Sequence, residues 1–220
     1  MLAAARMRGL PISDYVSPEH PVQKTILETL AEMCSLPVEQ VEVGIDGCSV
    51  PNFALPLFNA ALGFARLCDP RSLMAERATA CRRITQSMMA NPLMVGGPGR
   101  FDTRLMEVCS GRLVAKEGAE GYMILGIMGG VLGAESPGIG IAFKISDGDL
   151  SIRKANGETY HRVRPAVTLE ILRQMGYIRE KELESLAGDF GPLKPVTNWR
   201  KLVVGESRPA FTLQRNTQPA

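Results

Sequence analysis

The chain has 220 residues, of which 45% are hydrophobic and 22% charged, and its formal net charge is +2. This composition is enough for a substantial core in one or two domains. The near balance of charge and the low aromatic content (5%) argue against a nucleic-acid partner. The absence of an apolar run of about 18 residues argues against a membrane-spanning helix, so we expect no membrane association.

The five cysteines are scattered along the chain, at Cys34, Cys48, Cys68, Cys81 and Cys109. An odd number of cysteines without a CxxC pair predicts reduced thiols in a cytoplasmic protein rather than a disulfide framework. The same spacing argues against a self-contained zinc site. The first eight residues lack the order of charged and apolar segments that a signal peptide requires.

The first half of the chain is predicted to be mainly helical, because apolar residues recur there at helical spacing. Helices are expected over residues 2–8, from Ser17 to Cys34, from Pro56 to about Asp69, over 72–90 and from 100 to 108, with a short strand over 41–45. A glycine-rich loop, residues 96–99, allows close approach of the backbone to a ligand.

In the second half of the chain, the spacing of apolar residues changes to the two-residue period of β-strands. Three successive strands are expected over 111–116, 121–127 and 140–145, then a helix over 167–175 and an edge strand over 199–205. Asp147-Gly148 is typical of a hairpin turn after the third strand. Helices followed by an antiparallel meander and a further helix indicate the α+β class. We expect one domain over 1–213 and a disordered tail over 214–220.

Asp46 and Cys48 lie two apart in a tight glycine-containing turn that precedes an apolar helix. A free cysteine is most often a small buried residue, and an aspartate before a glycine is most often a turn former. The functional alternative is a metal ligand with a neighbouring carboxylate. That carboxylate would either keep the metal ligands in position or bind the ammonium group of an amino-acid substrate.

Lys116 ends an apolar strand, and Gly118 follows two residues later. Hydrolases of the penicillin-binding type place a Lys-x-Gly on a sheet edge beside the nucleophile. There the amine supplies a proton or a positive field, and the glycine lets the substrate lie along the strand. The alternative is a solvated lysine at the end of a strand.

Three further residues are candidates for substrate binding. Arg100 and Asp102 follow the glycine-rich loop, and an arginine there can clamp a carboxylate with two N–H groups. The alternative is a surface ion pair that supports the loop. Glu120 shares a turn with Lys116. A Ser-x-x-Lys match at Ser151 and Lys154 lies in a polar stretch, and roughly 0.4 such matches arise by chance, so it receives no role.

Several motifs in order resemble the thermolabile-type bacterial L-asparaginases (asparaginase II). They are Pro18–Gln23, Asp46–Leu57, Gly96–Thr103, Gly111–Gly121, Lys144–Asp149 and Trp199–Pro209. The resemblance implies an antiparallel sheet packed with helices, as part of the serine β-lactamase and penicillin-binding-protein-like fold. It also implies hydrolysis of L-asparagine to L-aspartate and ammonia by a serine nucleophile with lysine partners.

The resemblance assigns roles to residues of this chain. It implies that Lys116 is a catalytic lysine, that Cys48 is a metal ligand, usually for zinc, and that Asp46 is its active-site neighbour. The remaining candidates are expected to bind substrate: Arg100, Asp102, Gly118 and Glu120. One cysteine does not hold zinc tightly, because a stable site needs about three protein ligands. Zinc is therefore expected only in the complete enzyme.

Members of that family carry a further segment before the position that matches Met1, with the nucleophilic Ser-x-x-Lys and a Cys-Ser-Gly-Lys motif. We therefore expect an N-terminally truncated chain that needs a complementing N-terminal segment or a homo-oligomer to be active. One alternative is a non-catalytic remnant or amino-acid-binding module that needs a partner chain. Another is an acyl hydrolase that uses a serine of this chain: Ser49, Ser110 or Ser151.

Overall fold

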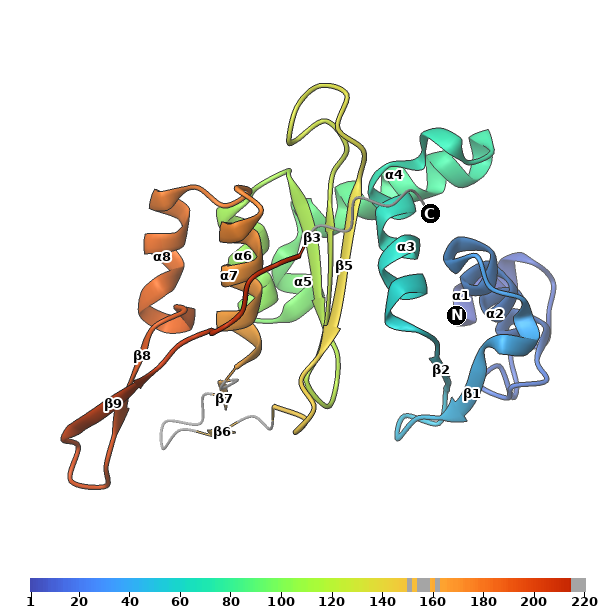
Figure 1. Ribbon diagram of the computed structural model, residues 1–220. Coiled ribbons are helices and arrows are strands. Elements are labelled where there is room, and N and C mark those ends of the chain that lie inside the picture. Colours follow the sequence, from blue (N-terminus) through green and yellow to red (C-terminus); the bar gives the residue numbers. More distant parts are fainter. Residues whose placement is uncertain (150–151, 154–158, 161–162, 215–220) are drawn as a thin grey trace.

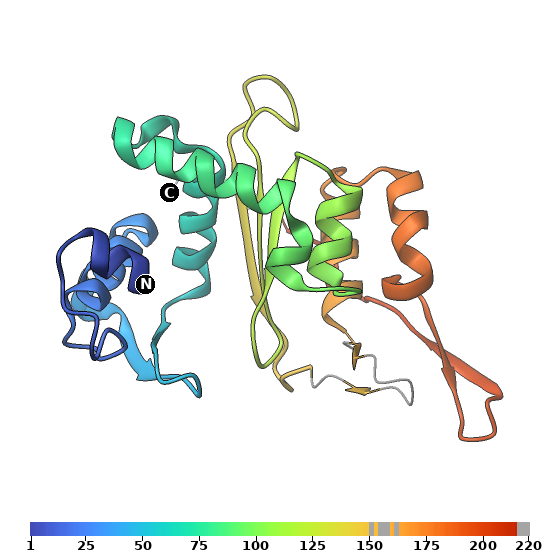
Figure 2. The same cartoon turned by 180° about the vertical axis from the view of Figure 1, so that it is seen from behind.

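The computed structural model of the protein describes residues 1–149, 152–153, 159–160 and 163–214. One antiparallel sheet lies between two groups of helices (Figures 1 and 2). This arrangement of helices and small antiparallel sheets confirms the α+β class. Ser151, Lys154 and the expected tail from residue 215 onward lie outside the described residues.

The chain begins with helices α1 (Leu2–Met7) and α2 (Pro21–Cys34). Helix α2 begins four residues later than the Ser17 start that we predicted. His20 is the reason, because its backbone is extended and its Nδ1 accepts a hydrogen bond from the backbone N–H of Val22, 3.1 Å away. Pro21 then occupies the first helical position, where no backbone donor is needed.

A short hairpin follows a 3₁₀ helix, η1 (Val38–Gln40). Strand β1 (Glu42–Ile45) agrees with the prediction, but its partner β2 (Pro51–Ala54) was not predicted. Strand β2 begins with a proline, which weakens its sequence pattern. It forms because it pairs with β1, whose last residue faces Pro51 at the end of the ladder.

Five helical segments then lead to the central sheet. They are α3 (Leu57–Cys68), the 3₁₀ helix η2 (Pro70–Ser72), α4 (Ala75–Ala90), α5 (Pro92–Gly96) and α6 (Phe101–Val108). Helix α4 begins three residues later than predicted, because the tight turn η2 takes up the preceding residues.

The central sheet has three strands, and its order β3-β4-β5 confirms the predicted meander. Its strands are β3 (Leu113–Glu117), β4 (Tyr122–Ile127) and β5 (Ile139–Lys144). Successive side chains point to opposite faces of a strand. Lys116 therefore shares one face of the sheet with Ile124, opposite it on β4, while Glu117 points to the other face.

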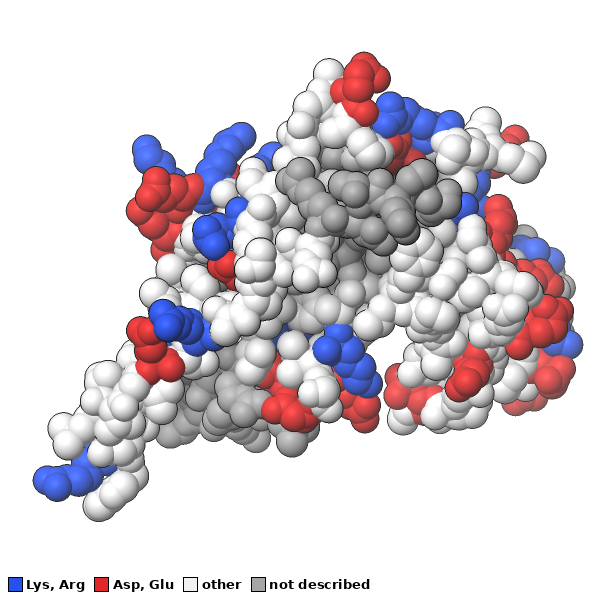
Figure 3. Space-filling view, in the orientation of Figure 1, with Lys and Arg blue, Asp and Glu red and all other residues white. Residues whose placement is uncertain are grey.

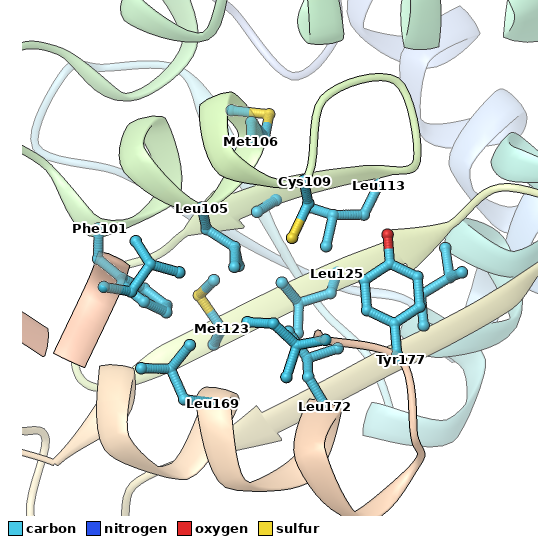
Figure 4. Close-up of a cluster of buried hydrophobic side chains, with 14 residues drawn as sticks. Phe101, Leu105, Met106, Cys109, Leu113, Met123, Leu125, Leu169, Leu172 and Tyr177 are labelled. Atoms are coloured by element: carbon cyan, nitrogen blue, oxygen red, sulfur yellow. The ribbon is translucent and has the colours of Figure 1, made fainter. Parts of the chain in front are cut away.

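The hydrophobic core lies on the face of the sheet toward which Glu117 points. There the strands pack against α6, α7 (Arg164–Gln174) and α8 (Glu180–Phe190), as Figures 1 and 4 show. The largest fully buried apolar side chains include Phe101, Leu105, Met123, Leu125 and Leu172.

The other face of the sheet packs closely against α3. Gly140 of β5 faces Gly126 of β4 in the register, and a Cβ atom at Gly140 would overlap the carbonyl oxygen of Ala61. A Cβ atom at Gly126 would overlap the Cys68 sulfur. These two glycines therefore allow the helix backbone to lie almost directly on the sheet.

The C-terminal part differs from two predictions. Within the described residues, the turn at Asp147-Gly148 does not lead to a strand that pairs with β5, as the predicted hairpin requires, because β6 (Ile152–Arg153) pairs with β7 (Thr159–Tyr160). The edge strand predicted over 199–205 begins later than expected, at Val203. Strand β9 (Val203–Ser207) pairs with β8 (Lys194–Thr197) in a separate ribbon, which projects from the body in Figures 1 and 2. No helix in the described part of the chain combines the length and hydrophobicity needed to cross a bilayer.

Candidate active site

An apolar groove of about 590 Å³ lies between the N-terminal helices and the sheet. Figure 3 shows the molecule hollowed at its lower edge between these two parts. Helix α2 lines the groove between Thr25 and Cys34, and α3 lines it between Ala60 and Leu67. The sheet contributes Lys116, Tyr122 and Ile124, so the predicted catalytic lysine lies on an open wall.

The ammonium group of Lys116 is held at the edge of β3. Its Nζ donates a hydrogen bond to the backbone carbonyl of Glu117 at 2.7 Å and lies 3.8 Å from Oδ2 of Asp102. The Lys116 side chain is 49% exposed, so the amine is positioned by the protein and partly open to solvent. This combination suits an amine that must meet a ligand in a defined position.

Asp102 is buried at the start of α6, with a side chain only 1% exposed. Its Oδ1 accepts a hydrogen bond from the N–H of Thr103, and its Oδ2 accepts one from the N–H of Glu117 at 3.3 Å. The carboxylate therefore ties the helix to the edge of β3. This geometry favours a supporting role for Asp102 over the direct substrate contact that the resemblance implies.

A buried ion network lies behind Lys116, on the opposite face of the sheet. Oε2 of Glu117 accepts a hydrogen bond from Arg100 at 2.7 Å, and Oε1 of Glu117 lies 3.7 Å from the Arg164 guanidinium. The side chains of Glu117 and Arg164 are each 1% exposed. Arg100 therefore pairs with a carboxylate of the protein. This agrees with the ion pair that was the alternative to substrate binding for this residue.

Arg164 also organises the turn that joins β3 to β4. Its Nη1 donates hydrogen bonds to the carbonyl oxygens of Gly118 at 2.6 Å and Tyr122 at 2.9 Å. The backbone N–H of Arg164 donates to the buried carboxylate of Asp149 at 2.9 Å. The guanidinium thus connects the start of α7 to the strand that carries Lys116.

The two backbone groups of Gly118 are already used within the turn. Its N–H donates to the carbonyl of Tyr122 at 2.9 Å, and its carbonyl accepts from Arg164. A Cβ atom at this position would lie 2.7 Å from a ring carbon of Tyr122. Gly118 is therefore required for packing of the turn, which is a different reason from the predicted contact with substrate.

Tyr122 is the polar aromatic residue of the groove wall. Burial, together with a smaller effect of the nearby Cys34, raises the pKa of Tyr122 to about 12. The phenol therefore stays neutral around pH 7. Glu120, in the same turn, is largely exposed and pairs with Lys144 at 3.2 Å, so its contact with substrate stays a prediction.

Asp46 and Cys48 share the β1–β2 turn, as predicted. Oδ1 of Asp46 accepts a hydrogen bond from the N–H of Gly47 at 2.6 Å, and the Cys48 sulfur lies 4.0 Å from Oδ2 of Asp46. Both residues are exposed. The β1–β2 and β3–β4 turns lie at the same end of the molecule in Figures 1 and 2, although the groove lining does not include Asp46 or Cys48.

Cys48 is the predicted zinc ligand, and Asp46 is its predicted neighbour. Within the described residues, no group of three or more His, Cys, Asp or Glu side chains is arranged to hold a metal ion. Tetrahedral zinc sites use three or four protein ligands. The described residues therefore do not fit a stable zinc site, and the metal role of Cys48 stays a prediction.

Sequence reasoning did not identify Glu117, Arg164 and Tyr122 as parts of the site. The alternation along β3 gives a signal for Glu117, because a glutamate facing a buried sheet surface needs a cationic partner. Arg164 has no such signal in its own segment, since it reaches the strand only through the packing of α7.

Comparison with models of protein families identifies a family for the chain. A family model described as L-asparaginase II matches residues 1–209, a range that includes all the motifs noted in the sequence. The search of curated proteins gives no match for the chain.

Proposed function

The chain belongs to the L-asparaginase II family. We therefore propose that it takes part in the hydrolysis of L-asparagine by water, which gives L-aspartate and ammonia. The observation that carries this proposal is the position of Lys116, whose amine is held by Asp102 and the Glu117 carbonyl at an open groove. We also propose that the sheet and its helices are part of a serine β-lactamase-like fold.

Lys116 acts in this proposal as the proton donor and as a fixed positive charge. A hydroxyl nucleophile attacks the carbon of the side-chain amide. The ammonium of Lys116 gives a proton to the nitrogen, which leaves as ammonia when the C–N bond breaks, and the proton of the hydroxyl restores the ammonium. A water molecule then releases aspartate from the acyl intermediate. The positive charge of Lys116 stabilises the oxygen that becomes negative in each tetrahedral state.

The nucleophilic serine is proposed to come from a complementing N-terminal segment that carries the Ser-x-x-Lys motif of the family pattern. Asp46 is proposed to face the ammonium group of the substrate. Asp102 and Arg100 are proposed to act indirectly, by holding β3 and hence Lys116 in place.

Release of ammonia from L-asparagine tests the proposal. The chain is assayed alone and mixed with a separately made N-terminal segment of the family, and we expect turnover in the mixture. Lys116→Met should reduce kcat by about a hundredfold or more, in the range typical of a lost proton-transfer group. Lys144→Met is the matched control, because Lys144 lies on the same sheet and pairs with the exposed Glu120.

The amino-acid-binding alternative predicts a different result from calorimetry. If asparagine or aspartate gives a saturable heat but no mixture releases ammonia, the chain is a binding module. If neither heat nor turnover appears at any ratio of the two parts, the asparaginase proposal is wrong. Substituting Ser49 and Ser110 one at a time in an active preparation tests the third alternative, a nucleophile within this chain.

A further inference from the structure

We propose that the groove beside Lys116 binds an apolar carboxylate, a straight-chain acid of about eight to ten carbons. The carboxylate would lie against Nζ of Lys116 and the chain between α2 and α3. This binding goes beyond asparagine hydrolysis and does not require it. The proposal follows from the shape of the groove, from its apolar walls and from the position of its charge.

The size of the groove suits a ligand of this kind. Its volume of about 590 Å³ lies within the range of ligand pockets. The residues of α2 that line it extend from Thr25 to Cys34, nine residues apart, which corresponds to about 14 Å along the helix. An extended chain of about ten carbons has a similar length.

The walls of the groove are apolar. Ile26, Leu30 and Met33 face it from α2, and Phe64 and Leu67 face it from α3. These positions recur at intervals of three and four residues, so each helix presents one continuous apolar stripe to the groove. Burying a hydrocarbon chain against such stripes is favourable in proportion to the area removed from water.

The polar side chains in the lining are already engaged or neutral. The hydroxyl of Thr25 donates to the Pro21 carbonyl at 3.0 Å and accepts from Arg8 at 3.2 Å. Tyr122 stays neutral because burial raises its pKa to about 12. The groove therefore offers a hydrocarbon chain few groups that would lose hydrogen bonds to water.

The charge of the groove selects an acid over an amine. Among the described residues that line it, Lys116 is the only charged one. Its ammonium group has three donors; among the described residues it donates a hydrogen bond to the Glu117 carbonyl and lies 3.8 Å from the Asp102 carboxylate. The acidic residues Glu28 and Glu32 of α2 are exposed and lie at helical positions away from the groove stripe.

The test is calorimetric titration of the chain with decanoate, octanoate and hexanoate, below the concentrations at which light scattering detects aggregates. We expect one saturable site and an affinity that falls about fourfold for each methylene removed, as expected for its transfer to an apolar site. Decyltrimethylammonium, with the same chain and a positive head, should bind much more weakly. Equal binding of both heads, or heat that never saturates, would overturn the proposal.

Variants of the chain locate the head group. Lys116→Met should weaken decanoate binding about tenfold or more and leave the binding of neutral decanol unchanged. Lys144→Met, outside the groove, should change neither. Arg8 is the nearby alternative cation, through its contact with Thr25. A larger loss in Arg8→Met than in Lys116→Met would contradict the proposed orientation.

A second pair of variants locates the hydrocarbon chain. Thr29→Trp fills the groove from α2 and should abolish decanoate binding, whereas Thr79→Trp places the same side chain on the exposed surface of α4 and should not. Circular dichroism checks that both variants fold. Unchanged binding in a folded Thr29→Trp variant would show that decanoate lies elsewhere.

Two outcomes separate this inference from the asparaginase proposal. Decanoate binding is measured on the chain alone, so failure of asparagine turnover leaves it intact. If the N-terminal segment binds the chain and restores turnover but decanoate does not bind, the groove does not hold an apolar acid. The inference would then be wrong, although the asparaginase proposal would stand.

Discussion

The ammonium of Lys116 lies 3.8 Å from Oδ2 of Asp102, a carboxylate that also accepts a hydrogen bond from the backbone of β3. Because Asp102 belongs to α6, this contact connects the lysine to a helix as well as to its own strand. The position of the amine therefore depends on packing between α6 and β3.

Replacing Asp102 by asparagine tests that dependence. Asp102→Asn keeps an oxygen acceptor but removes the buried charge, and we expect the free energy of unfolding to fall by about 1–3 kcal/mol. Urea denaturation measures the change. Asp189→Asn is the control, because Asp189 lies exposed on α8. Equal stability of the two variants would mean that the Asp102 carboxylate supports neither β3 nor Lys116.

Replacing Arg164 should have the largest effect on stability. Arg164→Ala removes the donors to the carbonyls of Gly118 and Tyr122, and it removes the guanidinium that lies 3.7 Å from the buried Glu117. Breaking a buried ion pair costs about 3–5 kcal/mol. Arg173→Ala, which breaks an ion pair of an exposed arginine on the same helix, should change the urea midpoint little. Similar midpoints for both variants would contradict the buried network.

Gly140 tests the close packing of α3 on the sheet. Gly140→Ala forces apart the helix and β5, because the new Cβ atom would overlap the carbonyl oxygen of Ala61. We expect a loss of about 1–3 kcal/mol or more in thermal or urea unfolding. Gly188→Ala on α8 has open space around it and should stabilise the protein by about 0.5–1 kcal/mol. A neutral Gly140→Ala variant would show that the helix lies further from the sheet.

The lowered pKa of Asp69 predicts that the stability of the protein depends on pH in the acid range. The side-chain hydrogen bonds from Arg71 hold the pKa of Asp69 at about 2, below its usual value of 3.8. A carboxyl with a lowered native pKa stabilises the fold above the unfolded pKa and loses this contribution as pH falls. The stability difference between the chain and Asp69→Asn should therefore disappear between about pH 4 and pH 2. A difference that stays constant down to pH 2 would refute this linkage.

Thiol reactivity should distinguish one cysteine from the other four. Cys48 is exposed and the other four cysteines are buried. Burial raises the pKa of the Cys68 and Cys109 thiols to about 12. Burial also raises the pKa of the Cys34 and Cys81 thiols. A disulfide reagent should therefore modify one thiol in the native protein and five after denaturation. The fast reaction should be lost in Cys48→Ser. Rapid modification of several thiols would mean that the core opens readily.

Local sequence patterns predicted the β3–β4–β5 meander, the helix α6 and the position of Lys116 at the end of a strand. Each of these depends on periodicity or turn residues within a short segment, which the sequence displays directly. The paired turn at Asp46 and Cys48 was predicted for the same reason. The start of α2 and the strand β2 were missed, because a histidine cap and an initial proline are weak local signals.

Tertiary structure alone decided what surrounds Lys116. Arg164 is distant in the sequence from Glu117, and the groove combines faces of α2, α3 and the sheet that no single segment contains. Such contacts depend on how amphipathic elements pack against one another, so periodicity reveals that a face is buried but not what buries it. The sequence therefore determined the elements and the candidate lysine, while packing determined its buried supports and the apolar groove beside it.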